Sequence, residues 1–144
     1  MRRIVLDTNC LLMSLPKRSP CHAVWTAICN GSITLCVSNE ILEEYMEILS
    51  QKTNEIIAYN VVELLLNLKN VVQITPHYKL HLISSDKDDN KFVDCAFAAG
   101  ASCIVSNDAH FKELSFVKFP KISVLTIGDF MRFVDSIANE SPQA

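Results

Sequence analysis

Apolar and polar residues along this chain follow two alternating patterns. Five short apolar runs have the length and composition of buried strands, at residues 3–7, 32–38, 71–76, 101–108 and 122–126. Five longer segments carry apolar residues at helical spacing, at residues 19–31, 39–51, 53–70, 88–100 and 128–138. Strands that alternate with helices predict an α/β fold of three layers, α/β/α, in which helices flank a mostly parallel central sheet.

Residues typical of helix ends support these boundaries. Ser19 and Pro20 suit the start of the first of these helices, and Gly31 suits the position just past its end. Ser38 suits the N-cap of the next helix. The chain has only three glycines and five prolines, so long loops are not expected.

Composition indicates one ordinary globular domain. The chain has 144 residues, of which 49% are hydrophobic and 20% are charged. We expect a single domain over residues 1–138 and a frayed tail over residues 139–144. Six cysteines without a C-x-x-C pair indicate reduced thiols of a cytoplasmic protein and argue against a zinc site. No apolar run suits a signal peptide or a membrane span, so no membrane association is expected.

Charge narrows the classes of function. The formal net charge is −3, which does not favour a protein that binds nucleic acid over its whole surface. A metal-dependent nuclease remains compatible with this charge, because its site requires several carboxylates.

Acidic residues follow two of the predicted strands. Asp7 follows the first strand, and Asn107 and Asp108 close the segment 101–108. The carboxyl ends of parallel strands lie at one edge of a sheet, where ligands of α/β proteins gather. Each group also has a purely structural interpretation, because Asp, Thr and Asn residues form turns and cap helices. Asp7 would then cap a short helix at residues 10–15.

Two predicted helices add further carboxylates. Four aspartates lie at or near the start of the helix at 88–100, namely Asp86, Asp88, Asp89 and Asp94. Acidic residues in a first turn complement the helix dipole, but this end is more acidic than capping requires. On the helix at 39–51, Glu44 lies near the flank of the apolar stripe, whereas Glu43 lies on a face that is expected to be exposed to solvent.

Taken together, these groups would converge on one edge of the sheet. Three or four carboxylates in one place repel one another unless a cation is bound. Oxygen ligands without paired His or Cys favour Mg²⁺ or Mn²⁺. Such sites usually act on phosphates, because the metal bridges protein carboxylate and substrate oxygen.

Three stretches resemble the PIN domain family, specifically its bacterial toxin-like branch of toxin–antitoxin type. They are "IVLDTNCLL", "SNEILEEYMEIL" and "DDNKFVDCAFAAGASCIVSNDAHF", and they occur in the family's order. The resemblance covers about residues 3 to 130. It implies a compact α/β/α fold and a Mg²⁺- or Mn²⁺-dependent ribonuclease with a carboxylate cluster.

The resemblance also implies which residues form the site. The family's catalytic and metal-binding acids fall on Asp7, Glu44, Asp89 and Asp108. Residues implied to orient ligands and water around them are Thr8, Asn9, Asp94 and Ser106. Alternative ligands, given the close spacing of the acids, are Glu43, Asp86 and Asp88.

The implied substrate is RNA, cut by a metal-bound water that attacks in line. The implied partners are a small antitoxin protein and, in many relatives, a second copy of the chain. Positive charge near the site would bind RNA phosphates. The candidates are Arg2, Arg3, Lys17, Arg18, Lys87, Lys91 and Lys112. His110 suits a loop histidine with a structural hydrogen bond better than a residue that contacts substrate.

Two other classes of function are compatible with parts of the pattern. The domain would be a catalytically silent module that binds RNA or protein if its site held no working metal. A phosphatase of the haloacid dehalogenase type, or a response-regulator receiver, also places Asp after a strand. Phosphatases of the first class have the motif D-x-D-x-T, but Asn9 occupies the position of its second aspartate. Neither class has a motif that matches "SNDAHF".

Overall fold

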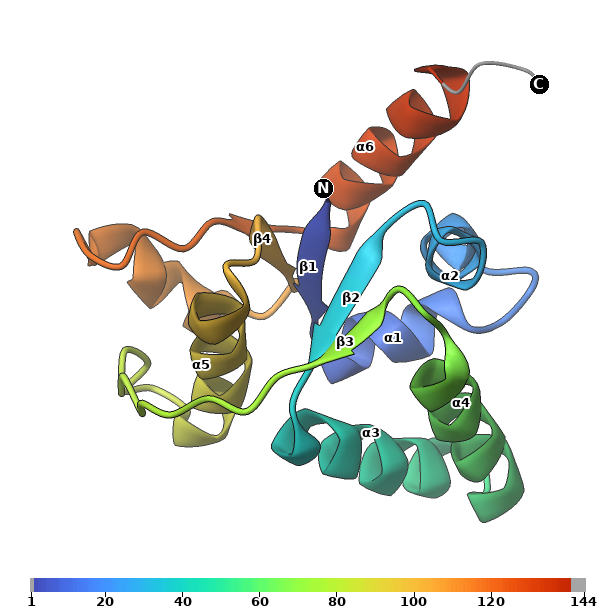
Figure 1. Cartoon of the computed structure of the whole chain (residues 1–144), viewed down its shortest axis with the longest axis horizontal. Coiled ribbons are helices and arrows are strands. Elements are labelled where there is room, and N and C mark those ends of the chain that lie inside the picture. Colours follow the sequence, from blue (N-terminus) through green and yellow to red (C-terminus); the bar gives the residue numbers. More distant parts are fainter. Residues whose placement is uncertain (1, 141–144) are drawn as a thin grey trace.

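The central element of the computed structural model, which describes residues 2–140, is a sheet of five parallel strands (Figure 1). The strands are β1 (Arg3–Leu6), β2 (Thr34–Val37), β3 (Val71–Gln73), β4 (Cys103–Val105) and β5 (Val124–Leu125). Their order in the sheet is β3-β2-β1-β4-β5, and every neighbouring pair is parallel. The predicted α/β fold with a parallel sheet is confirmed.

The connections place helices on both faces of the sheet. The α-helices are α1 (Thr8–Ser14), α2 (His22–Cys29), α3 (Asn39–Lys52), α4 (Glu55–Asn67), α5 (Asn90–Ala99) and α6 (Ile127–Glu140). Two 3₁₀ segments, η1 (Lys87–Asp89) and η2 (Ala109–Phe116), complete the chain. The strand order runs one way from β1 to β3 and the other way from β4 to β5. Right-handed crossovers therefore put α1 to α4 on one face and α5 with η2 on the other, as Figure 1 shows.

The core lies between these layers. Strands β1, β2 and β4 are almost wholly buried, and α5 packs against all three of them. Tyr45 of α3 is fully buried, and its hydroxyl donates a 2.5 Å hydrogen bond to the carbonyl of Leu6 at the end of β1. All six cysteines are free thiols, as predicted, and five of them are buried. Among the described residues, no helix is long and apolar enough to cross a membrane.

Several predicted boundaries need correction. Helix α2 starts at His22, not near Ser19, because the preceding residues form turns in which Ser19 accepts a hydrogen bond from the Cys21 amide. The first turn of the helix predicted at 88–100 is the 3₁₀ segment η1. Strand β4 ends at Val105, so the polar residues after it lie outside the sheet.

The expectation of short loops is wrong for residues 74–86. This segment contains no helix or strand. Side chains of neighbouring elements satisfy its backbone instead. Asn90 bonds both the amide and the carbonyl of Ile83, at 2.9 Å each, and Asp94 accepts a 3.0 Å bond from the Leu80 amide. Polar residues of α5 therefore substitute for the strand pairing that such a segment lacks.

At the C-terminus, α6 continues to Glu140, past the predicted start of the tail. The rest of the predicted frayed tail, residues 141–144, lies outside the described residues.

Candidate functional site

The site begins where β1 and β4 end together. The backbone amide of Asp7 donates to the carbonyl of Val105 at 3.0 Å, which continues the pairing of the two strands by one residue. The Ser106 hydroxyl donates a 2.6 Å bond to Oδ2 of Asp7, and it accepts a 3.0 Å bond from the amide of Asp108. One serine thus connects both strand-end aspartates.

Asp7 is 6% exposed and occupies the N-cap position of α1. Within the described residues, its carboxylate makes no side-chain cap hydrogen bond of good geometry, and the capping interaction predicted as an alternative is limited to the influence of the nearby Asn9 amide. Burial raises its pKa, and the Ser106 hydroxyl and the Asn9 amide oppose that shift. The charges of Asp108 and Glu44 raise it further. The Asp7 carboxylate therefore lies near two other acids in a place that disfavours charge.

Asp89, at the end of η1, approaches the same place from the other face of the sheet. Burial raises its pKa to about 6, against the effect of a hydrogen bond from His110. The charges of Asp108, Asp86 and Asp7 add to the increase. The charges of Asp7 and Asp108 thus act on Asp89, and the charge of Asp108 also acts on Asp7.

His110 lies among these carboxylates. Its Nδ1 is 3.1 Å from Oδ2 of Asp89 and 3.1 Å from Oδ1 of Asp108, and it is 3.7 Å from Oδ2 of Asp86. The hydrogen bond to Asp89, together with the charges of Asp108 and Asp86, raises the pKa of the imidazole. The sequence suggests only a structural hydrogen bond for this loop histidine; its position two residues after Asp108 is the feature that points to the acids.

Glu44 of α3 completes the group. It is half-buried, whereas Glu43 is exposed, which makes Glu44 the better placed of the two candidates. The Thr8 hydroxyl donates to Oε2 of Glu44, and the Lys91 ammonium lies 2.8 Å from Oε1. Both oxygens of this carboxylate therefore already have partners.

The remaining candidates are placed around this group. Asp86 caps η1 by accepting a 3.1 Å bond from the amide of Asp88, which is itself exposed. Asp94 is buried. The groups that influence its pKa are the Leu80 amide and the charges of His81, Glu40 and Lys79, none of which influences the pKa of Asp7 or Asp89 as a main cause. Asn9 is exposed. Asn107 accepts a 3.0 Å bond from the amide of Ile127, so it fixes the start of α6.

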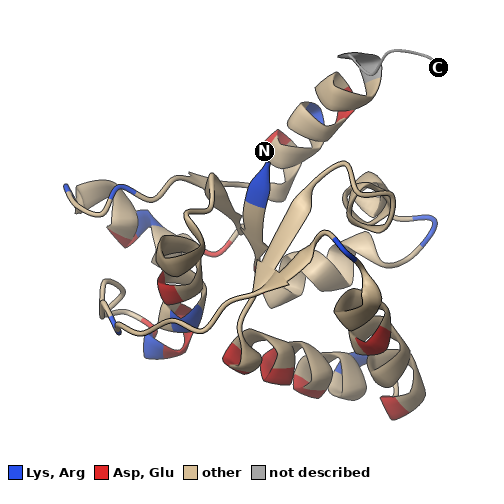
Figure 2. Cartoon of the chain, in the orientation of Figure 1, with Lys and Arg blue, Asp and Glu red and all other residues tan. Residues whose placement is uncertain are grey.

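The donor set suits a hard divalent cation. Four carboxylates, from the end of β1, from α3, from η1 and from the turn after β4, influence one another, and oxygen donors of this kind favour Mg²⁺ or Mn²⁺. Ligand atoms of Asp86, Asp89 and His110 lie within 4.8 Å of one another, which is close enough for the three side chains to hold one ion together. Figure 2 shows acidic residues along α3 and at the start of α5, at the lower side of the molecule.

Comparison with known proteins identifies the family. The sequence profile of the PIN domain matches residues 3–110, which include every residue of the acidic group. The chain belongs to the PIN domain family. No curated protein sequence matches the chain significantly.

Solved structures of PIN proteins have the same fold. The VapBC complex of Salmonella typhimurium bound to DNA matches with a TM-score of 0.60 and 20% identity, over 88% of this chain and 99% of that chain. VapBC-1 of nontypeable Haemophilus influenzae matches with a TM-score of 0.61 and 15% identity, over 88% of this chain and 98% of that one. The PIN domain endonuclease Utp24 matches with a TM-score of 0.51 and 14% identity, over 86% and 84%.

Proposed function

We propose that this PIN domain is a Mg²⁺- or Mn²⁺-dependent endoribonuclease that hydrolyses RNA phosphodiester bonds, and that it is the toxin of a toxin–antitoxin pair. The observation that carries the proposal is the charge interaction that links Asp7 with Glu44 and Asp108, and Asp89 with Asp7 and Asp108, although these acids come from four separate parts of the chain. All four are partly or fully buried, and their mutual repulsion has a cost that a cation would offset.

The metal would be held by Asp7, Asp89 and Asp108, with Glu44 beside them. When bound, it supplies Lewis-acid polarisation of the phosphate and a water of lowered pKa. Ser106 orients the Asp7 carboxylate by donating a hydrogen bond to it. The serine hydroxyl does not titrate near neutral pH, so this donor is present throughout that range. His110 holds Asp89 and Asp108 in a fixed relation to each other, which limits the reorganisation needed when the site is loaded.

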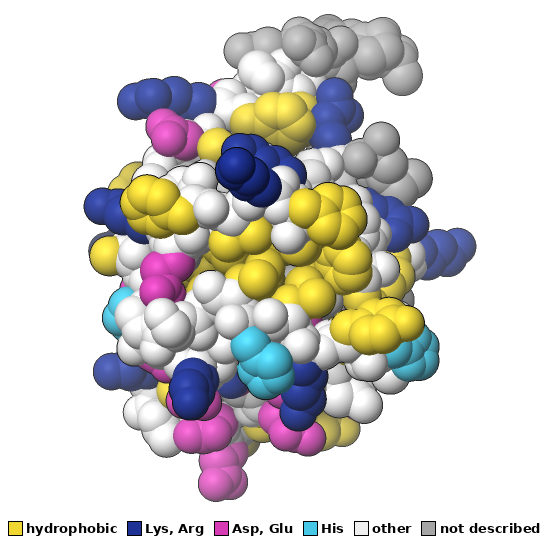
Figure 3. Space-filling view, turned by 90° about the vertical axis from the view of Figure 1, so that its left-hand side faces the viewer, with side chains coloured by type: hydrophobic (Ala, Val, Ile, Leu, Met, Phe, Trp, Pro, Cys, Tyr) yellow, Lys and Arg dark blue, Asp and Glu magenta, His cyan; other side chains and the backbone are white. Residues whose placement is uncertain are grey.

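A groove beside the acids provides room for a nucleic-acid chain. It has a volume of about 790 Å³ and continues from Ser106, Asn107 and Asp108 along η2 and β5. Two of its lining residues, Lys112 and Lys121, are exposed lysines that suit RNA phosphates. Figure 3 views the side of the molecule that carries η2 and shows apolar side chains gathered near its centre, with Lys and Arg side chains around them.

The proposed partners follow from the similar structures, which are those of VapBC proteins. We infer that a small antitoxin protein neutralises this chain. A second copy of the chain is a further proposed partner. The exposed apolar residues of α4, Ile56, Tyr59 and Leu66, favour such an interface.

Cleavage of a labelled single-stranded RNA by the purified chain tests the proposal. We expect cleavage with Mn²⁺ or Mg²⁺ and none with EDTA. The variant Asp7→Asn keeps an oxygen that accepts the Ser106 hydrogen bond but removes the charge. It should lower the rate by about a hundredfold or more, because the metal contributes several kcal/mol. The control Asp129→Asn, on an exposed aspartate of α6, should cleave like the unmodified chain. Equal rates for Asp7→Asn and the unmodified chain would contradict the site.

A silent binding module is the second candidate function. It is favoured by the internal pairing of Glu44 with Lys91 and of Asp89 with His110, which balances part of the negative charge without a metal. RNA binding that persists in EDTA, with no cleavage under any metal, would support this candidate. A DNA strand of the same sequence in the same assay separates ribonuclease from general nuclease activity.

A further inference from the structure

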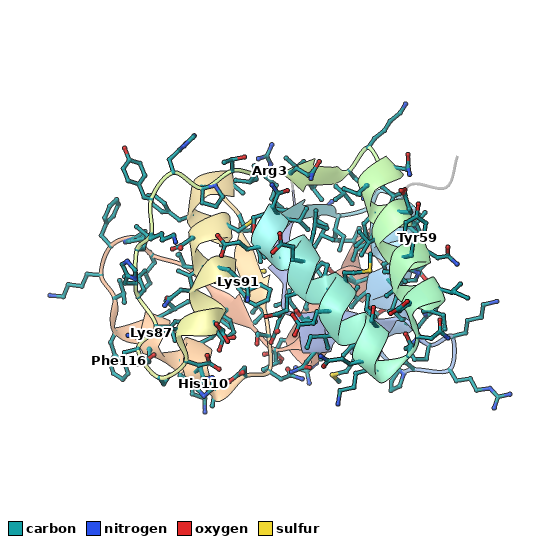
Figure 4. All side chains as sticks on the ribbon, turned by 90° about the horizontal axis from the view of Figure 1, so that it is seen from below. Arg3, Tyr59, Lys87, Lys91, His110 and Phe116 are labelled. Carbon is teal, nitrogen blue, oxygen red and sulfur yellow. The ribbon has the colours of Figure 1, made fainter. Side chains whose placement is uncertain are left out.

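Lys91 makes an ion pair inside the acidic group. It is the second residue of α5, and its ammonium lies 2.8 Å from Oε1 of Glu44 on α3. The side chains are only 16% and 24% exposed, respectively, so this pair is better shielded from water than an ordinary surface pair. In Figure 4 the labelled Lys91 lies between α5 and α3, whereas Lys87 lies nearer the outer side.

The pair occupies the carboxylate that a second divalent ion would need. Sites with two metal ions place them about 3.5–4 Å apart and share carboxylates between them. Here Oε2 of Glu44 accepts from the Thr8 hydroxyl, and Oε1 lies against the ammonium. A carboxylate oxygen can accept more than one donor, but a divalent ion at Glu44 would lie beside the positive charge of Lys91 and be repelled by it.

The charge balance of the group leads to the same conclusion. Lys91 neutralises one of the four carboxylates, and one divalent ion neutralises two more. A second divalent ion would then exceed the charge of these four acids, and the remaining acid, Asp86, already lies 3.7 Å from His110.

We propose that Lys91 is the built-in second cation of this site, so that the site takes one divalent ion and not two. The ion is held by Asp7, Asp89 and Asp108, and Glu44 is held by Lys91 and Thr8. Lys91 is therefore a positioning residue for Glu44. This inference rests on the proposed metal-dependent function and specifies the number of ions.

A purely structural role for the pair would tie α5 to α3 without influence on metal binding. The two roles predict different results for one measurement, the number of Mn²⁺ ions bound per chain. A structural tie lowers stability when Lys91 is replaced and leaves the number unchanged. A built-in cation changes the number.

The test is the count of Mn²⁺ ions on the purified full-length chain at neutral pH, by isothermal titration and equilibrium dialysis. We expect one ion for the unmodified chain and two for Lys91→Met, which keeps the apolar stem without the charge. The double variant Lys91→Met with Glu44→Gln should return to one ion. The matched control is Lys87→Met, because Lys87 is an exposed lysine of η1, and it should bind one ion.

Two ions on the unmodified chain would overturn the inference, even if Lys91→Met did not fold. One ion on a folded Lys91→Met variant would also overturn it. The variant Asp7→Asn separates the inference from the proposed function. If Mn²⁺ binding does not depend on Asp7, or if the unmodified chain binds no Mn²⁺, the metal site itself is wrong. If the ion depends on Asp7 but the count does not respond to Lys91, only the role of Lys91 is wrong.

Discussion

The hydroxyl of Ser106 donates a 2.6 Å hydrogen bond to the buried carboxylate of Asp7, across 99 residues of sequence. The same hydroxyl accepts from the amide of Asp108. This serine therefore fixes the relation between the ends of β1 and β4, and with it the relation between two aspartates of the candidate site.

Replacing Ser106 by Ala should affect both stability and chemistry. The buried Asp7 carboxylate loses its hydrogen-bond donor, so the free energy of unfolding should fall by about 1–3 kcal/mol. The pKa of Asp7 should also rise, since this donor is the largest of the effects that lower it. Urea denaturation measures the first effect, and the pH profile of RNA cleavage measures the second.

Two controls accompany this variant. Ser106→Thr keeps the hydroxyl and should restore much of both properties. Ser115→Ala, on an exposed serine of η2, should change neither. A Ser106→Ala protein as stable as the unmodified chain would show that the hydrogen bond does not support Asp7.

The pKa of Asp89 predicts how metal binding depends on pH. Its pKa in the folded state is about 6, above the ordinary value of 3.8, and burial is the main cause. The carboxylate must lose its proton to bind a cation. Mn²⁺ affinity should therefore fall about tenfold for each pH unit below 6 and level off above it. Titration with Mn²⁺ between pH 5 and pH 8 measures this, and a flat profile would contradict the role of Asp89.

The same pKa has the opposite effect on the stability of the metal-free protein. A raised folded-state pKa means that the folded protein holds this proton more tightly than the unfolded chain does. The contribution of Asp89 to stability is then fully present below pH 3.8 and is lost as pH rises through about 6. Added Mn²⁺ should offset that loss. Asp89→Asn, which carries no proton to lose, should show neither effect in thermal denaturation across this range.

Glu113 anchors the segment that carries Asp86. Its carboxylate accepts from the amides of Ser84 and Ser85, at 2.9 and 3.3 Å, and from both of their hydroxyls. These hydrogen bonds lower its pKa to about 2, so the anchor is present above the unfolded-state pKa of 4.5 and weakens as pH falls toward 2. Glu113→Gln should speed hydrogen exchange at Ser84 and Ser85 several-fold at neutral pH. Glu47→Gln, on an exposed glutamate of α3, should leave that exchange unchanged.

Tyr45 supports the site from beneath. Its fully buried hydroxyl bonds the carbonyl of Leu6, the residue before Asp7. Tyr45→Phe keeps the ring but leaves that carbonyl without its donor, which should cost about 1–3 kcal/mol of unfolding free energy in chemical denaturation. Tyr59→Phe removes an exposed hydroxyl and should cost almost nothing. Similar losses for the two variants would contradict the importance of the buried bond.

Much of the fold is predictable from the sequence because its evidence is local. The apolar runs of β1, β2 and β4 and the helical spacing in α3 are properties of neighbouring residues, and the resemblance to PIN domains supplies their arrangement. The prediction fails where tertiary contacts take over. Residues 74–86 form a long segment because Asn90 and Asp94 of the next helix satisfy part of its backbone, and such side-chain contacts leave no periodic pattern in the sequence.

The candidate site shows the same division. That Asp7 and Asp108 follow strands is visible in the sequence, and parallel pairing puts them at one edge. The partners of Lys91 and His110 are not visible, because each depends on a contact between different elements. Lys91 is identified from the sequence only as a candidate for binding RNA, and the structure places its ammonium against Glu44.

The reversal of strand order has a consequence for the protein during synthesis. Strand β4 inserts beside β1, although more than half of the chain separates them. A ribosome-bound chain that has not yet exposed β4 holds Asp7 and Glu44 but lacks Ser106 and Asp108. We therefore expect chains truncated before β4 to lack a complete acidic group and to cleave no RNA, because Asp7 and Asp108 come together only when β4 pairs with β1.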